Sequence, residues 1–115
     1  MVEVEKGIDR EAQFSIGQVV KHRFYPFRGV IFDVDPTFSN TDEWWESIPA
    51  EVRPRKDQPF YHLLAENDEY AYTAYVSEQN LLLDDSGKPV GHPQVAEMFG
   101  AFRGAYYEPR EQYGH

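Results

Sequence analysis

The sequence predicts a mainly β fold, a small antiparallel barrel of five short strands with one or two short helices. Five apolar or alternating segments follow one another closely between residues 19 and 83. Few residues show helical periodicity, so the crossover helices that a parallel sheet requires are missing. A strongly bent barrel also hides strand edges, which suits a chain in which 16% of the residues are aromatic.

Turn-forming residues separate the five segments. Tyr25–Gly29 supplies proline and glycine, Asn67–Glu69 forms a polar hairpin, and Ser77–Asn80 forms a short turn. Between these turns, apolar and β-branched residues predict strands. The predicted strands are Val19–His22, Val30–Asp35, Tyr61–Glu66, Ala71–Val76 and Leu81–Leu83.

The second strand has the clearest period of two. One face is expected to carry Val30, Phe32 and Val34, and the other Ile31, Asp33 and Asp35. Pro36 cannot donate to a sheet ladder, so we expect the strand to end before it.

Two short helices are predicted. In the first, Asn40 and Glu43 form a plausible capping box, Trp44 and Trp45 follow with Ile48 on the same face, and Pro49 ends the run. The second begins at Pro93 and has one apolar stripe. That stripe consists of Val95, Met98, Phe99 and Phe102.

The chain divides into one domain with two flanking segments. Residues 1–13 are charged and predict a flexible N-terminal arm, and residues 14–103 form the domain with an insertion at 37–60. Residues 104–115 form a tyrosine-rich tail containing Tyr106, Tyr107 and Tyr113. The tail lacks periodicity, so it is either disordered or wrapped over the barrel.

Composition excludes several classes of protein. The 115 residues carry 20 acidic and 11 basic side chains, a net charge of −9, and no cysteine, which removes disulfides and thiolate chemistry. No apolar run approaches the ~20 residues of a membrane span, and no signal peptide is evident. We expect a cytoplasmic protein. The negative charge also disfavours strong nonspecific binding to nucleic acid.

Catalytic motifs are lacking. The sequence has no Gly-x-Ser-x-Gly elbow, no phosphate-binding glycine loop and no histidine pair at helical ligand spacing. Asp33 and Asp35 could hold a divalent cation, but a solvated strand face is the commoner outcome for such a pair. His62 could titrate or serve as a structural histidine. We therefore expect no enzyme activity and no cofactor.

The charges are unevenly distributed. Lys21, Arg23 and Arg28 lie in an acid-free stretch with Phe24, Tyr25 and Phe27 interleaved, and Arg53, Arg55 and Lys56 form a second basic cluster. Residues 57–87 instead carry seven acidic and no basic side chains. The basic, aromatic hairpin tip is either a contact surface for DNA or protein, or a mouth in which Phe24 and Phe27 tuck into the barrel. Trp44 and Trp45 are likewise either a lid or a protein-docking patch.

Four ordered blocks of the sequence resemble the YccV-like (HspQ) family, also called the hemimethylated-DNA-binding domain. They are Phe14–His22, Tyr25–Pro36, Pro59–Leu64 and Ala74–Leu81. The resemblance implies an SH3-like barrel in a small bacterial heat-shock or stress regulator. It also implies that the protein binds hemimethylated DNA or modulates proteolysis by a Lon-type protease, and that it self-associates as a trimer.

Two functions from different classes follow from these observations. The leading hypothesis is a non-catalytic adaptor or modulator of Lon-type proteolysis, acting through contacts with the protease or its substrates. The net charge and the acidic stretch favour it. The alternative is a DNA-binding protein that recognises hemimethylated sites through the basic, aromatic first hairpin.

Overall fold

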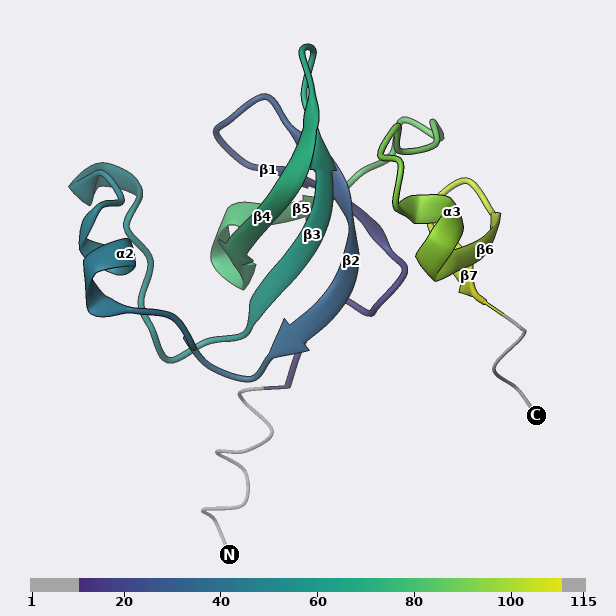
Figure 1. Ribbon diagram of the computed structural model, residues 1–115. Coiled ribbons are helices and arrows are strands. Elements are labelled where there is room, and N and C mark those ends of the chain that lie inside the picture. Colours follow the sequence, from purple (N-terminus) through teal and green to yellow (C-terminus); the bar gives the residue numbers. More distant parts are fainter. Residues whose placement is uncertain (1–10, 111–115) are drawn as a thin grey trace, which may run out of the picture.

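The computed structural model describes residues 11–110 (Figure 1). It confirms the mainly β, SH3-like fold: five antiparallel strands in the order β4-β3-β2-β1-β5. The 3-10 helix η2 (Glu78–Asn80) leads from β4 to β5, and these two strands form no ladder with each other in the part of the chain described. The strongly bent sheet is therefore barrel-like with open edges. Its strands are β1 (Val19–His22), β2 (Arg28–Asp35), β3 (Phe60–Glu66), β4 (Ala71–Ser77) and β5 (Leu81–Leu83).

The sheet is buried on both faces, because successive strand residues point to opposite sides. Val20, Ile31 and Leu63 belong to one apolar cluster, which includes Tyr61 and Leu81. The neighbouring residues Val19, Val30 and Leu64 belong to a second cluster. This second cluster is completed by Val90, Val95, Phe99 and Tyr107 from the C-terminal segment. The C-terminal elements are therefore part of the core.

A β-bulge interrupts β2. Ile31 pairs with Leu63 and Asp33 with His62, so Phe32 is an extra residue on this strand. The bulge reverses the alternation: Val34 packs with the cluster that contains Ile31, and Phe32 packs with the other. The predicted common face of Val30, Phe32 and Val34 is wrong at Val34, because a strict period of two requires an unbroken ladder.

The insertion between β2 and β3 contains the first predicted helix. It forms α2 (Asp42–Glu46), followed by the 3-10 helix η1 (Ala50–Val52), and extends to one side of the sheet (Figure 1). Thr41 caps α2 in place of Asn40: its Oγ1 accepts a hydrogen bond of 3.0 Å from the backbone N–H of Trp44. The helix is thus one residue out of register with the predicted cap.

The C-terminal segment differs from the prediction. Only Val95–Met98 is helical (α3), and Phe99–Phe102 is instead the strand β6, paired with β7 (Tyr107–Pro109). The helical stripe is therefore wrong at Phe99 and Phe102. Gly100 weakens a helix here, and pairing with β7 supplies the backbone hydrogen bonds that the helix would have made.

Part of the tyrosine-rich tail packs against the domain. Tyr107 is 6% exposed, and its hydroxyl oxygen accepts a hydrogen bond of 2.8 Å from the N–H of Val90. Tyr106 forms an isolated bridge with Gln18, whereas Tyr113 and the first ten residues of the predicted arm lie outside the described residues. No helix between residues 11 and 110 is long and apolar enough to cross a bilayer.

Candidate functional site

His22 organises the exposed tip between β1 and β2. Its Nδ1 accepts hydrogen bonds of 3.0 Å from the backbone N–H groups of Phe24 and Tyr25, and its ring stacks on that of Tyr25 at 4.8 Å. Burial lowers the pKa of His22 and so favours the neutral ring, in which Nδ1 can accept these hydrogen bonds. Phe24 is 58% exposed, whereas Phe27 is half-buried against Tyr72. Of the two rings that could tuck into the barrel, only Phe27 does so.

Arg28 is held by partners inside the domain. Its guanidinium donates to Glu66 Oε2 at 2.7 Å and to Asp84 Oδ2 at 3.0 Å, and also to the carbonyl oxygens of Lys88 and Pro89. Burial raises the pKa of Asp84, but hydrogen bonds from Arg28 and Ser86 outweigh it, so the net pKa is lowered. The side chain of Arg28 thus fastens the β5–α3 connection to β2.

Arg23 and Arg55 meet at Gln79. Arg23 Nε donates to the Gln79 carbonyl oxygen at 3.0 Å, and the backbone N–H of Arg55 donates to Gln79 Oε1 at 3.4 Å. The structure therefore brings together one cation from each predicted basic cluster. Arg55 also pairs with Asp57 at 2.9 Å, but its side chain is 72% exposed, so solvent screens that pair. No ion pair is found for Lys21 within residues 11–110.

The other two cations of the second cluster stabilise the insertion. Arg53 donates to the carbonyl oxygens of Ile48 and Glu46, and its guanidinium lies 5.0 Å from the centroid of Trp45. Lys56 donates to Asp42 at 2.8 Å, and its Nζ lies 4.7 Å from the same indole ring. Trp45 thus makes cation–π contacts with both side chains.

Both tryptophans are half-buried. Trp45 Nε1 donates to the carbonyl oxygen of Pro54 at 2.8 Å. Trp44 instead packs edge-on against Tyr75 of β4, with ring centroids 5.4 Å apart. Trp45 therefore anchors the insertion, and Trp44 faces the sheet.

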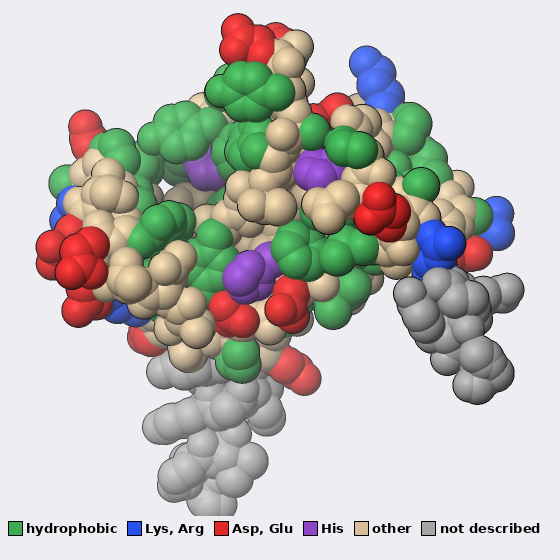
Figure 2. Space-filling view, in the orientation of Figure 1, with side chains coloured by type: hydrophobic (Ala, Val, Ile, Leu, Met, Phe, Trp, Pro, Cys, Tyr) green, Lys and Arg blue, Asp and Glu red, His purple; other side chains and the backbone are tan. Residues whose placement is uncertain are grey.

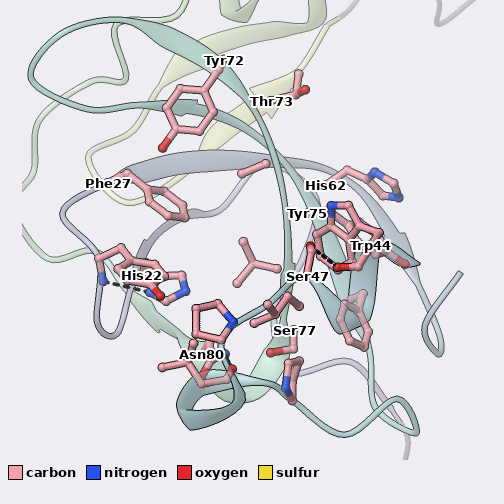
Figure 3. Close-up of a pocket in the computed structure, with 18 of the residues that line it drawn as sticks. His22, Phe27, Trp44, Ser47, His62, Tyr72, Thr73, Tyr75, Ser77 and Asn80 are labelled. Atoms are coloured by element: carbon pink, nitrogen blue, oxygen red, sulfur yellow. Dashed lines mark hydrogen bonds between the residues drawn. The ribbon is translucent and has the colours of Figure 1, made fainter. Parts of the chain in front are cut away.

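Trp44 and β4 line a groove that the sequence alone did not reveal. The groove has a volume of about 640 Å³, and aromatic rings approach it from two sides (Figure 3). His22, Phe27 and Tyr72 lie on one side, and Trp44, His62 and Tyr75 on the other. The predicted strand at 71–76 was the only signal, because the groove requires the insertion to fold beside β4.

The β2 bulge gathers a cluster of polar residues. Ligand atoms of Asp33, Asp35 and His62 lie within 4.8 Å of one another, so these side chains could hold a metal ion. Within the cluster, Asp35 Oδ2 accepts a hydrogen bond from Tyr75 at 2.8 Å and lies 3.0 Å from His62 Nε2. These bonds give the cluster a structural role. Burial, together with Asp35, raises the pKa of Tyr75 to about 12.

The fold and these surfaces define a class of protein: a small SH3-like β domain with an exposed aromatic loop tip and an aromatic groove. Residues 12–106 match the family model described as "Hemimethylated DNA-binding protein YccV like", and the chain belongs to this family. This confirms the family resemblance seen in the sequence.

Curated relatives include F-box only protein 21 from Mus musculus, which is 33% identical over 90% of this chain. The proteins of the same name from Homo sapiens and Pongo abelii are each 32% identical over the same share. This chain spans only 16% of the length of each relative. No solved structure matched the chain.

Proposed function

We propose that this chain is a non-catalytic, cytoplasmic domain that binds hemimethylated DNA through the β1–β2 tip. The description of its family supports this proposal. The structural observation that carries it is that Arg23 and Arg55, from distant segments, both contact Gln79 and line one surface depression. The ring of Phe24, which follows Arg23 in the chain, is exposed. Arginine guanidinium groups position a protein on phosphates, and an apolar ring contacts a methyl group in the major groove.

The arrangement of the cations sets the expected strength of binding. Arg28 and Arg53 donate to internal partners, and Lys56 is paired with Asp42. Of the other three cations, Arg55 has only a solvent-screened pair with Asp57, so Lys21, Arg23 and Arg55 allow about two or three phosphate contacts. The slope of log K against log salt should then be about −2 to −3, compared with about −5 if all six predicted cations bound phosphate.

Fluorescence anisotropy with short duplexes tests this proposal. The probes are duplexes methylated on one strand, at cytosine C5 or adenine N6, and their unmethylated counterparts. Arg23→Gln should weaken binding to every duplex and reduce the salt slope by about 1, whereas Phe24→Ala should reduce the preference for methylated DNA. Arg103→Gln is the matched control, because Arg103 is exposed and pairs with Glu108 on the β6–β7 hairpin. Equal binding of methylated and unmethylated duplexes would remove the proposal.

A second candidate function is modulation of Lon-type proteolysis by protein contacts, with self-association as a trimer. The commitment of Arg28, Arg53 and Lys56 to internal partners favours it, because the acidic side chains then dominate the surface. Within the acidic stretch of residues 57–87, Asp68 and Glu69 are exposed at the β3–β4 turn. Purified Lon with a labelled substrate tests this function: the turnover rate should change with added protein, and Asp68→Lys with Glu69→Lys should abolish the change. An unaltered turnover rate would exclude it.

A further inference from the structure

The outer edge of β4 offers backbone groups for pairing. Two hydrogen bonds bracket the β3–β4 ladder: Asn67 N–H to the Tyr70 carbonyl at 3.1 Å, and Glu78 N–H to the Pro59 carbonyl at 2.9 Å. Hydrogen-bonded pairs alternate in an antiparallel ladder, so residues 72, 74 and 76 bond to β3. The N–H and C=O groups of Thr73 and Tyr75 point away from it. Within residues 11–110 these groups have no backbone partner in another element.

The aromatic groove runs along this open edge. Every residue from 72 to 77 lines it, although neighbouring strand residues point to opposite faces of the sheet. The groove therefore includes the edge itself and both sides of β4. The insertion contributes Ile48, Pro49 and Val52 to the lining of the groove. Asn80 Nδ2 donates to the Val52 carbonyl oxygen at 3.3 Å and so links the insertion to η2.

The two sides of the groove have similar chemistry. His22, Phe27 and Tyr72 form one aromatic wall, and the other includes Trp44 and Tyr75 (Figure 3). The lining contains no Asp, Glu, Lys or Arg side chain. A strand placed against β4 would direct successive side chains alternately to these two walls, and apolar side chains would be favoured at both.

Acidic side chains lie beside the groove, on the β3–β4 hairpin and on the insertion. Figure 2 shows them over the β3–β4 hairpin and over α2, with hydrophobic and histidine side chains between. Asp68 and Glu69 are exposed at the hairpin, and Glu43, Glu46 and Glu51 are exposed on the insertion. This charge favours basic residues on either side of a bound apolar segment and repels a nucleic-acid backbone.

We propose that the groove binds an extended segment of a partner protein, which adds to the edge of β4 as a sixth strand of the sheet. The segment has apolar side chains over about six residues, roughly 17 Å of strand, and lysine or arginine at its ends. Main-chain hydrogen bonds to Thr73 and Tyr75 give affinity, and the aromatic walls select the side chains. The groove shares His22 and Phe27 with the β1–β2 tip but includes neither Arg23 nor Arg55, and the proposal does not depend on DNA binding.

Selection from a phage-displayed library of random decapeptides, followed by anisotropy with the enriched peptides, tests the proposal on the full chain. Thr73→Pro removes one outward N–H without breaking a bond to β3, since proline is tolerated on a strand edge. Leu83→Pro is the matched control on the other open edge. There, the bonds from Asp84 N–H to Val19 and from Arg23 N–H to Asn80 show that Leu83 also points outward.

The wild-type chain and Leu83→Pro should enrich peptides that have a continuous apolar run with basic ends. Thr73→Pro should bind these peptides about tenfold or more weakly. Hydrogen exchange gives a second measurement that needs no variant: the amides of Thr73 and Tyr75 should become protected only when the peptide is bound.

Equal enrichment by Thr73→Pro and the wild type would overturn the proposal. Peptide binding without protection of the amides of Thr73 and Tyr75 would also overturn it. A wild-type oligomer that Thr73→Pro converts to monomer would assign the edge to a second copy of this chain, and would also contradict a partner segment.

Discussion

Replacing Arg28 by methionine should destabilise the domain strongly, because it leaves two carboxylates without their partner. The Arg28 side chain is only 19% exposed, and the side chains of Glu66 and Asp84 are 24% and 7% exposed. Removing one member of a fully buried ion pair costs about 3–5 kcal/mol. Partial access of water to this cluster reduces the expected loss to about 2–4 kcal/mol. For a domain of this size, that loss lowers the melting temperature by about 10 °C or more.

Urea unfolding, followed by the fluorescence of Trp44 and Trp45, measures this loss. The urea concentration at the unfolding midpoint should fall for Arg28→Met, with little change in the dependence of the unfolding free energy on urea concentration. Arg103→Met should leave the midpoint almost unchanged. The difference also depends on pH. Because the folded pKa of Asp84 lies below its ordinary value of 3.8, its stabilisation is present above pH 3.8 and is lost as the pH falls through the folded pKa. Equal midpoints for the two variants, or a difference that persists at the lowest pH, would refute this reasoning.

Three further predictions concern the packing of the domain. Gly17→Ala should lower the melting temperature by several degrees in calorimetry, because φ is +98° and a Cβ would lie 2.6 Å from the carbonyl oxygen of Tyr107; an unchanged melting temperature would contradict this. The folded pKa of His22 is lowered, so its contribution to stability is present above pH 6.5 and is lost as the pH falls through the folded pKa. In an NMR titration, the amides of Phe24 and Tyr25 should shift together with the imidazole below pH 6.5. Amide signals that stay fixed would contradict the role assigned to Nδ1. Tyr107→Phe should cost about 1–2 kcal/mol in urea unfolding, since the buried N–H of Val90 loses its acceptor; a cost equal to that of Tyr106→Phe, at an exposed ring, would show that the bond contributes nothing.

The strands could be predicted because their determinants are local. Val19–His22 and Leu81–Leu83 were predicted with the bounds that the structure has, since turn residues flank both. The β2 bulge and the strand at Phe99–Phe102 could not be predicted in this way. Each depends on a partner strand, β3 or β7, whose register the local pattern does not contain.

The candidate site was predictable in composition but not in geometry. Arg23, Phe24 and Tyr25 remain exposed, as expected for a tip. Arg28, which sequence reasoning grouped with them, instead contacts Glu66 and Asp84, residues 38 and 56 positions away in the chain. Pairing between distant charges follows from strand register and loop path, so a one-dimensional count of charges cannot distinguish a structural cation from an available one.

The sequence by itself determined the fold class, the lack of cysteine chemistry and the uneven placement of charge, because local propensity and composition are sufficient for these properties. Only the tertiary structure decided which cations are available, which face Val34 joins, and where the aromatic rings of β4 and the insertion come together. Segments distant in sequence create those features when they pack. The groove beside β4 exists because the sheet ends there and the insertion folds beside its open edge.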